Sequence, residues 1–466
     1  MTVVILLADG VRPDTLHATI ESGKVPALAR LRDEGAFHRV TSCFPSVTGP
    51  AYTPFLLGRF PGPLGLPGLR WFDRERATCT FPDYTRSYVG PQMNRVDQDL
   101  DPDAPTIFEL CDSSLGSMTP VSRGLTKENK IGRLTAKTAF RAARTHFSGS
   151  VAKWLDVDRE IAGLVVDHIR REQPEFTFAA MMGVDKTSHS AGQPSPLTDE
   201  ALQIVDETAA RIRADAERDG RWKDMHIWIT SDHGHSPVTD HEDLAGLVRE
   251  WGFRTVAHPW IYKLRPEVAV MVSGNAMAHI YLDLGARERA FWPNVPFRYH
   301  AIVELLLERE SVDIMILPNE AGATVRSARG DAEVVLKNGT LCYRRTSGDP
   351  LGLGQNVCNA SMDETFDLTA HTDYPDSIAQ IATIARSARS GEIILSAARG
   401  WDYRSKYEPI PHVSSHGALH REHMFVPLLT SRQYGGTPRR TTDVMPSALE
   451  ILGHPIPSGL DGVSFI

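Results

Sequence analysis

The sequence has few cysteines, and their spacing matches no known cysteine-built scaffold. Its 466 residues contain five of them, and no C-x-x-C pair occurs: Cys43, Cys79, Cys111, Cys342 and Cys358. An odd number of widely spread cysteines indicates neither a disulfide framework nor a cysteine-ligated zinc site. We therefore expect most of these side chains to be reduced and partly buried.

Long hydrophobic runs and an excess of positive charge are also absent. No apolar stretch approaches the roughly 20 residues that cross a bilayer, so no membrane span is predicted. Lys plus Arg number 50 against 58 Asp plus Glu, a net charge of -8, which argues against a general binder of nucleic-acid backbones. The N-terminus, MTVVILLADG, has no basic region before its short apolar run. It predicts a core strand of a cytoplasmic protein and no signal peptide.

The sequence contains no glycine-rich phosphate loop and no dinucleotide-binding fingerprint. It does contain a regular alternation of predicted strands and helices. Apolar runs over 2–8, 176–182 and 225–230 predict buried parallel strands, and amphipathic patterns over 25–32, 151–172 and 198–219 predict helices. This order is typical of a parallel α/β sheet.

The pattern changes after about residue 240. Short alternating runs at 268–272 and 278–284, and a hairpin over VVLKNGTLCYRR with Asn338-Gly339 as a type I′ turn, predict an inserted α+β cap. The main sheet is expected to resume near 392–395. Because 466 residues exceed what one hydrophobic core usually holds, we divide the chain into a first core part (1–239), the cap (240–407) and a closing core part (408–466).

Polar residues follow the predicted core strands, at the edge where open α/β sheets bind ligands. The candidates are carboxylates and imidazoles: Asp9, Asp185, His189, Asp232, His233 and, in the later cluster PHVSSHGALHREH, His416. Each residue alone has a simpler interpretation as a turn or helix cap. Together they form the inventory for two zinc-type ions that flank a phosphoryl group.

Thr48 is the candidate nucleophile. It lies at or just before a helix expected over 51–57, with Pro50 near the first turn. The helix dipole there lowers the cost of a threonine alkoxide, so the hydroxyl would act as a nucleophile if a metal helped to deprotonate it. A plain helix N-cap is the alternative interpretation.

With these segments in view, the sequence resembles the alkaline phosphatase superfamily and, within it, the type I phosphodiesterases and nucleotide pyrophosphatases. The resemblance rests on LLADGVRPD, FPSVTGPAYTPFLLG, GVDKTSHSAG, ITSDHGHSP and SSHGALH in the family's order, and on the ending TTDVMPSALEILGHPIPSGLDGVSF. It implies a doubly wound, mostly parallel α/β core with helices on both faces, two divalent metal ions, with zinc expected, and a phospho-threonine intermediate.

The resemblance also assigns roles to individual residues. It gives one metal ion the ligands Asp185, His189 and His416, and the other, which also contacts Thr48, the ligands Asp9, Asp232 and His233. The expected activity is hydrolysis of a small phosphodiester or nucleotide pyrophosphate. A phosphonate or phosphomonoester hydrolase is the alternative, and a non-catalytic binding protein is the rival from another class. The intact set of candidates speaks against that rival, and nothing in the sequence indicates the oligomeric state.

The sequence departs from the family at one point. Related phosphodiesterases carry an Asn after the nucleophile that donates to a phosphate oxygen, and the corresponding PGPLGLPGLRWFD has none. Arg70 would replace this donor and favour a more highly charged substrate, or else it faces solvent. Lys186, next to the candidate ligand Asp185, is a second candidate for contact with the substrate. Among the nearby histidines, His235 is the best candidate for a hydrogen-bonding role. Specificity is expected in the irregular stretch 62–105 and in the cap.

Overall fold

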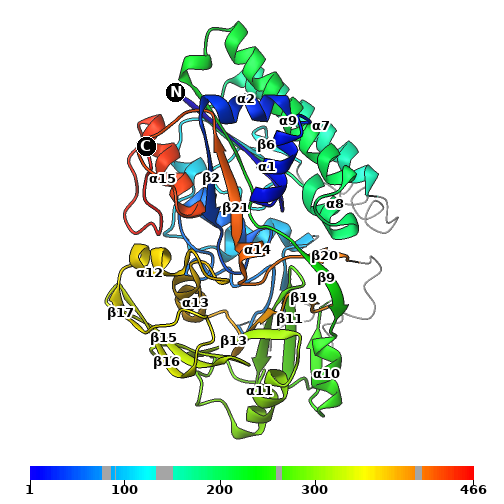
Figure 1. Ribbon diagram of the computed structural model, residues 1–466, viewed down its shortest axis with the longest axis vertical. Helices are drawn as coiled ribbons and strands as arrows, with labels where there is room; N and C mark the ends of the chain where they lie inside the picture. The colour runs from blue at the N-terminus through cyan, green and yellow to red at the C-terminus, as the bar shows by residue number, and fades with distance from the viewer. Residues whose placement is uncertain (76–84, 90, 133–150, 259–264, 405–411) are drawn as a thin grey trace.

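Two β-sheets, one above the other along the longest axis, form the framework of the computed structural model (Figure 1). The structure describes residues 1–75, 85–89, 91–132, 151–258, 265–404 and 412–466. Cys79, parts of the stretch 62–105 and the expected cap boundary at 407 lie outside these residues. Both chain termini lie beside the upper sheet.

The upper sheet has seven strands in the order β2-β21-β8-β1-β7-β5-β6. Its parallel part comprises β8 (Met225–Thr230), β1 (Thr2–Ala8), β7 (Phe176–Met181), β5 (Ser114–Ser117) and β6 (Lys130–Ile131). Strand β21 (Phe425–Thr430) runs antiparallel to β8 and to the edge strand β2 (Ala36–Thr41). Strand β2 therefore runs in the direction of β8 and ends at the same edge of the sheet.

Helices cover both faces of this sheet. Val3, Ile5 and Leu7 of β1 belong to a hydrophobic cluster with α3 (Thr53–Leu57) and α15 (Val444–Leu452). The alternate residues of β1 belong to a second cluster, shared with α1 (Pro13–Glu21), α2 (Pro26–Glu34), α7 (Ala152–Glu172) and α9 (Pro196–Arg218). Because β1 is buried on both faces, its sequence is one continuous apolar run, and such a run is easily predicted as a strand. The predicted doubly wound α/β core is confirmed.

The lower sheet is almost entirely antiparallel. Its nine strands, in spatial order, are β10 (Thr255–Ala257), β11 (Val268–Ser273), β12 (Met277–Leu282), β18 (Ile393–Ala397), β13 (Val312–Asn319), β14 (Gly322–Ser327), β15 (Gly330–Lys337), β16 (Thr340–Gly348) and β17 (Val357–Ala360). Only β10 and β11 pair in parallel among these strands. The Asn338-Gly339 turn between β15 and β16 has positive φ at both residues, 51° and 79°, as a type I′ turn requires.

Helices also pack on both faces of the lower sheet. Helices α10 (Leu244–Glu250) and α11 (His300–Leu307) share one hydrophobic cluster with Met315 and Leu317 of β13. Helix α13 (Ser377–Arg386) shares another with Ile314 and Ile316, and α12 (Met362–Thr369) packs at its edge. The prediction that the main sheet resumes near 392–395 is wrong, because β18 lies between β12 and β13. A short apolar run marks a buried strand but not the sheet that it joins.

A small three-stranded sheet connects the two large ones. Strand β9 (Ser236–His241) leads the chain toward the lower sheet, and it pairs with β19 (Gly400–Asp402) and β20 (Ser414–Ser415) on the way back. The segments that flank the nine-stranded part therefore lie side by side, next to the residues that precede β9 and follow β20.

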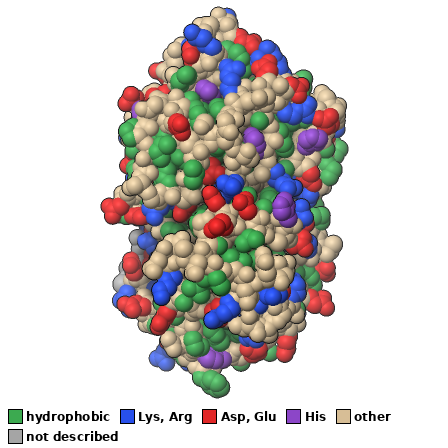
Figure 2. All heavy atoms as spheres, turned by 60° about the vertical axis from the view of Figure 1, so that its left-hand side comes forward, with side chains coloured by type: hydrophobic (Ala, Val, Ile, Leu, Met, Phe, Trp, Pro, Cys, Tyr) green, Lys and Arg blue, Asp and Glu red, His purple; other side chains and the backbone are tan. Residues whose placement is uncertain are grey.

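The stretch 62–105 contains short elements in its described residues. Strands β3 (Arg70–Phe72) and β4 (Thr85–Ser87) pair with each other, and the turn η2 (Pro91–Arg95) and α4 (Val96–Asp99) follow. Among the described residues, no helix is long and apolar enough to cross a membrane. On the face seen in Figure 2, acidic and basic side chains are intermixed, with apolar ones scattered between them.

Candidate active site

The predicted site residues meet at one edge of the upper sheet, beyond the carboxyl ends of three adjacent strands. Asp9 follows β1, Asp232 and His233 follow β8, and Asp185 lies in helix α8 (Gly183–Ala191), which follows β7. One ligand atom from each of Asp9, Asp185 and His233 lies within 4.8 Å of the others. The sheet order β8-β1-β7 therefore brings these side chains together.

Asp185 and His189 follow β7 as expected, and they lie on a helix, α8, which was not predicted. They are four residues apart on α8, so both project from one face, and His189 Nε2 is 3.2 Å from Asp185 Oδ1. The helix begins directly after β7 because the buried Asp158 of α7 accepts the backbone N–H groups of Met182 and Gly183, at 3.1 and 2.6 Å. The start of α8 therefore depends on a residue that lies 25 positions earlier in the chain, and no local pattern predicts it.

The Thr48 hydroxyl faces the candidate ligands. Its Oγ1 lies 3.3 and 3.4 Å from the two carboxylate oxygens of Asp9 and 3.2 Å from His233 Nε2. The expected helix begins as a single 3-10 turn, η1 (Pro50–Tyr52), whose N-cap residue is Gly49. Thr48 is therefore not the helix cap, and its hydroxyl is directed to the cluster.

The loop that carries Thr48 is fixed by contacts from several parts of the chain. Ser42 donates from its hydroxyl to the backbone carbonyl of Asp232, and Ser46 donates to that of Ala418 at 3.0 Å. The Phe44 N–H donates to Gln380 Oε1 of α13 at 2.7 Å. The lower half of the molecule thus contributes to holding the loop that carries the candidate nucleophile Thr48.

A second group of donors surrounds Asp185. Ligand atoms of Asp185, His189, His235 and His416 all lie within 4.8 Å of one another. Asp185 Oδ1 is 3.0 Å from His235 Nε2 and 3.6 Å from His416 Nε2. His235 was expected only as a hydrogen-bonding neighbour, yet it lies as close to Asp185 as His189 does. Its signal in the sequence was the spacing of two from His233 at the end of a strand.

The imidazole rings are oriented for Nε2 to face the cluster. The Nδ1 atoms of His189, His233 and His416 lie 2.9, 3.1 and 3.0 Å from the backbone carbonyls of Ser414, Gly234 and Ser46. A carbonyl accepts, so Nδ1 carries the proton and Nε2 keeps its lone pair. Such backing by a carbonyl is what orients metal-ligating histidines.

The electrostatics of the cluster indicate that a cation belongs there. Asp9, Asp185 and Asp232 are at most 1% exposed. Burial raises the pKa of Asp9 well above its usual range, and the nearby Asp232 and Asp185 raise it further. Burial also raises the pKa of Asp232. Burial alone would do the same to Asp185, but the Lys186 ammonium and the hydrogen bonds of His189 and His235 hold its pKa well below the usual range.

One buried oxygen shows the need for a cation most directly. Asp232 Oδ1 accepts the Gly10 N–H at 3.3 Å, but within the described part of the chain Oδ2 has no hydrogen-bond partner. Burying an unpaired carboxylate oxygen costs several kcal/mol unless a cation or donor compensates it. A donor set of three carboxylates and four imidazoles fits two divalent ions.

Lys186 lies against the cluster, whereas Arg70 contacts the lower sheet. The Lys186 ammonium is 2.7 Å from Asp185 Oδ2, and 32% of the side chain is exposed. Arg70 is the first residue of β3, and its Nη1 donates to the Val272 carbonyl of β11 at 3.4 Å. Lys186 thus contacts a candidate metal ligand, and Arg70 contacts the lower sheet.

The turn between β11 and β12 borders the site, which sequence patterns did not predict. The His416 N–H donates to the Gly274 carbonyl at 3.2 Å, and the Ala276 N–H donates to the His416 carbonyl at 3.0 Å. A Cβ at Gly274 (φ 62°) would lie 2.5 Å from Val47 Cγ1, so only glycine fits here. In the same turn, the Asn275 side chain is 2.7 Å from His412, whose ring lies 4.4 Å from that of His189.

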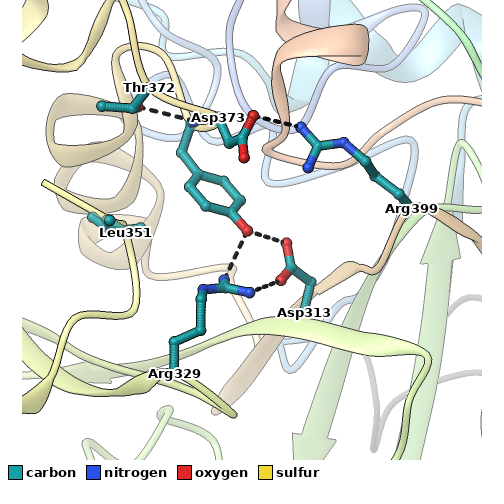
Figure 3. A pocket seen from close by; sticks show the side chains of 8 residues that line it. Asp313, Arg329, Leu351, Thr372, Asp373 and Arg399 are labelled. Carbon is teal, nitrogen blue, oxygen red and sulfur yellow. Dashed lines mark hydrogen bonds and ion pairs between the residues drawn. The ribbon is translucent and has the colours of Figure 1, made fainter.

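A cavity of about 260 Å³ lies elsewhere, in the lower half of the molecule (Figure 3). Its charged side chains pair with one another. Arg329 donates to Asp313 at 2.8 Å and to the Tyr374 hydroxyl at 2.7 Å, and Arg399 donates to Asp373 at 3.1 Å. These pairs stabilise the wall of the cavity. The candidate active site is instead the Asp/His cluster at the upper sheet.

Comparison with solved structures shows the same fold in several enzymes. Phosphonoacetate hydrolase from Sinorhizobium meliloti 1021, in complex with phosphonoformate, is 16% identical, with a TM-score of 0.57 over 97% of this chain and 95% of that chain. An inactive threonine-to-alanine variant of murine ectonucleotide pyrophosphatase / phosphodiesterase 5, in complex with AMP, is 14% identical, with a TM-score of 0.55 over 98% and 96%. A quadruple mutant of alkaline phosphatase PafA is 13% identical, with a TM-score of 0.58 over 99% and 98%.

The sequence itself also identifies the family. No curated protein matches the chain, but the family description "Type I phosphodiesterase / nucleotide pyrophosphatase" matches residues 3–420, which include every predicted site residue. The chain therefore belongs to the type I phosphodiesterase / nucleotide pyrophosphatase family.

Proposed function

We propose that this protein is a two-zinc hydrolase of small phosphodiesters or nucleotide pyrophosphates in which Thr48 is the nucleophile. The observation that carries the proposal is the position of Thr48 Oγ1, within 3.4 Å of both Asp9 oxygens and of His233 Nε2. A threonine that only stabilised the loop would have no reason to face two candidate metal ligands.

Two groups of residues would hold the metal ions. The first comprises Asp185, His189 and His416, with His235 beside them, and the second comprises Asp9, Asp232 and His233. When bound, two divalent ions neutralise the charge of the phosphoryl group and lower the pKa of the attacking hydroxyl. Zinc suits this mixture of imidazole and carboxylate ligands.

The chain's own groups account for the remaining steps. Asp9 accepts the hydrogen bond of the Thr48 hydroxyl and so orients Oγ1 toward the substrate. Attack by Oγ1 forms a bond to phosphorus as the bond to the leaving alcohol or phosphate breaks, and water then hydrolyses the phospho-threonine. The inactivity of the threonine-to-alanine variant of the murine relative supports this role for a threonine.

We also propose that residues 240–407 act as a cap that selects the substrate. The β11–β12 turn supports this proposal because it reaches from the lower sheet to His416 and Val47, next to the nucleophile. The core would then supply the chemistry and the cap one wall of the substrate site.

A phosphonate or phosphomonoester hydrolase is the second candidate, and Lys186 is the feature that favours it. Its ammonium is directed at Asp185, and 32% of its side chain is exposed at the cluster, so we infer that it can contact a substrate group of higher charge. The complex of the Sinorhizobium meliloti hydrolase with phosphonoformate is consistent with this candidate.

A substrate panel separates these functions. Rates would be measured with zinc on a nitrophenyl phosphodiester, phosphomonoester, phenylphosphonate ester and sulfate ester. Fastest turnover of the diester is expected from the main proposal, and fastest turnover of the monoester or phosphonate from the second. An absence of turnover on all four by zinc-loaded protein would contradict both and support a binding protein of this fold.

Removal of metal is expected to abolish hydrolysis. The three buried carboxylates cannot bind a phosphoryl group unless cations compensate their charge. Protein dialysed against a strong chelator should lose essentially all activity and regain it with zinc, as measured by initial rates. Full activity after chelation, with metal absent by elemental analysis, would contradict the two-metal site.

Replacing Lys186 with methionine is expected to change substrate preference. A hydrogen bond to a charged group contributes about 1.5–3 kcal/mol, so kcat/KM for a monoester should fall about tenfold to a hundredfold. The fall for a diester should be smaller, because that substrate has one negative charge fewer. Arg70→Met, which removes the other predicted substrate cation, is measured in parallel for comparison. Equal losses on both substrates would show that Lys186 does not read substrate charge.

A further inference from the structure

A second cluster of possible metal ligands lies at the other end of the parallel strands of the upper sheet, beyond the amino end of β7. Ligand atoms of Cys111, Glu175 and His454 all lie within 4.8 Å of one another. Cys111 directly follows helix α5 (Ile107–Leu110), Glu175 directly precedes β7, and His454 is the second residue after α15. Three segments far apart in the sequence therefore meet at one point.

The backbone holds each donor in position. The Cys111 N–H donates to the Ile107 carbonyl at 3.0 Å, and the His454 N–H donates to the Leu449 carbonyl at 2.9 Å. The latter bond closes the C-terminus of α15 after Gly453, whose φ is 78°. Glu175 accepts from the Asp112 N–H and from His454 Nε2, the latter at 2.9 Å. Little conformational entropy would remain to be lost on binding an ion.

The cluster is separate from the active site but accessible from solvent. Glu175 and Asp185 lie beyond opposite ends of β7, whose six residues span about 20 Å. The side chains of Glu175 and His454 are 20% and 17% exposed. One side faces the hydrophobic core, where Leu110, Cys111 and Leu452 pack at its edge. An ion could enter here without passing through the catalytic cluster.

The chemistry of the donors selects the ion. A thiolate, an imidazole and a carboxylate are the three donor types that zinc takes from proteins, and a water completes a tetrahedral site. A simple ion pair would explain the contact between Glu175 and His454, but it would not require a thiol in the same small space. We propose that Cys111, Glu175 and His454 form a third zinc site, which fastens the end of α15 to the edge of the sheet.

Cobalt substitution tests this proposal through the sulfur ligand. The full-length chain would be stripped of metal, reloaded with Co²⁺ and scanned in the near ultraviolet for a thiolate-to-cobalt charge-transfer band. The proposed catalytic ligands contain no sulfur, so the band is expected in the wild type and its absence in Cys111→Ser. The control Cys358→Ser, which removes an exposed thiol in β17, should keep the band. A wild-type protein without the band, or a Cys111→Ser variant that retains it, would overturn the proposal.

Zinc content and stability give a second, independent readout. By elemental analysis the wild type should hold about one zinc per chain more than Cys111→Ser or His454→Gln, and zinc should raise its unfolding temperature further than it raises theirs. Turnover on a model diester should be unchanged in both variants, since the site is a strand's length from Thr48. Equal zinc contents would overturn the proposal. The surface change His454→Gln keeps the test valid if Cys111→Ser folds poorly.

Discussion

Replacing Thr48 with alanine is expected to lower kcat by about four orders of magnitude or more, the usual effect of removing a catalytic nucleophile. The side chain loses only a hydroxyl and a methyl group, at a position that does not cap the following helix. Folding and metal content should therefore stay close to those of the wild type. The measurement is steady-state turnover of a model diester at saturating zinc, with zinc content determined on the same sample.

The conservative variant Thr48→Ser is the matched control. It keeps an oxygen at the position 3.3 Å from Asp9 Oδ1, so it should retain most of the activity that alanine abolishes and still form a covalent phospho-enzyme. Phosphate trapped on the protein after an acid quench would show this intermediate by mass spectrometry. Wild-type turnover in Thr48→Ala would reduce Thr48 to a structural residue and contradict the proposed function.

Replacing Arg440 with methionine is expected to reduce the free energy of unfolding by about 3–5 kcal/mol, the cost of removing one partner of a buried ion pair. The Arg440 side chain is 3% exposed and its partner Asp376 is fully buried. Its Nε and Nη2 donate to both carboxylate oxygens of Asp376, at 2.9 and 2.8 Å. Without the guanidinium, a buried carboxylate loses its compensating charge. Urea denaturation followed by circular dichroism measures the change.

The neighbouring Arg439 is the control for this experiment. Its side chain is 40% exposed, and its ion pairs with Asp363 and Asp367 are 3.4 and 3.5 Å long. Exposed pairs of this kind contribute at most about 1 kcal/mol, so Arg439→Met should change stability little. Equal losses in the two variants would show that burial of the Arg440–Asp376 pair is not what makes it important.

The Arg440–Asp376 pair also connects the two halves of the molecule to the loop that carries Thr48. Asp376 Oδ2 accepts from Gln380 Nε2 at 2.7 Å, and Gln380 Oε1 accepts the Phe44 N–H at 2.7 Å. Arg440 follows β21, Gln380 lies on α13, and Phe44 precedes Thr48 by four residues. A chain of charge-assisted and buried hydrogen bonds therefore links the packing of the halves to the position of Thr48, the proposed nucleophile.

The core strands are the part of the fold that sequence patterns predict best. Strands β1, β7 and β8 are continuous apolar runs because both of their faces are buried, and their predicted bounds agree with the structure to within a residue. The helix α8 was not predicted, and the placement of β18 was predicted wrongly. Both depend on long-range contacts, the first on capping by Asp158 and the second on pairing with β12 and β13.

The candidate site shows the same division. A polar residue next to an apolar run or a predicted helix is visible in one dimension, so local pattern was enough to find the candidates, and the family resemblance assigned their roles. These candidates are Asp9, Thr48, Asp185, His189, Asp232, His233 and His416. The sequence did not predict that His235 lies close to Asp185 or that Gly274 packs against Val47. Each of these contacts joins segments that have no fixed spacing along the chain.

Local periodicity and the order of the motifs were thus enough to predict the α/β class, the family and the side chains of the candidate site. The reason is that the burial of a strand and the residues at its end are properties of short segments. The rest depends on the folded chain: the order β8-β1-β7, which brings the carboxylates to one edge, the contact of the lower sheet with His416, and the meeting of Cys111, Glu175 and His454. The physical reason is that these features arise from pairing and packing between distant residues, and a single sequence contains no local signal for the partner that each residue will meet.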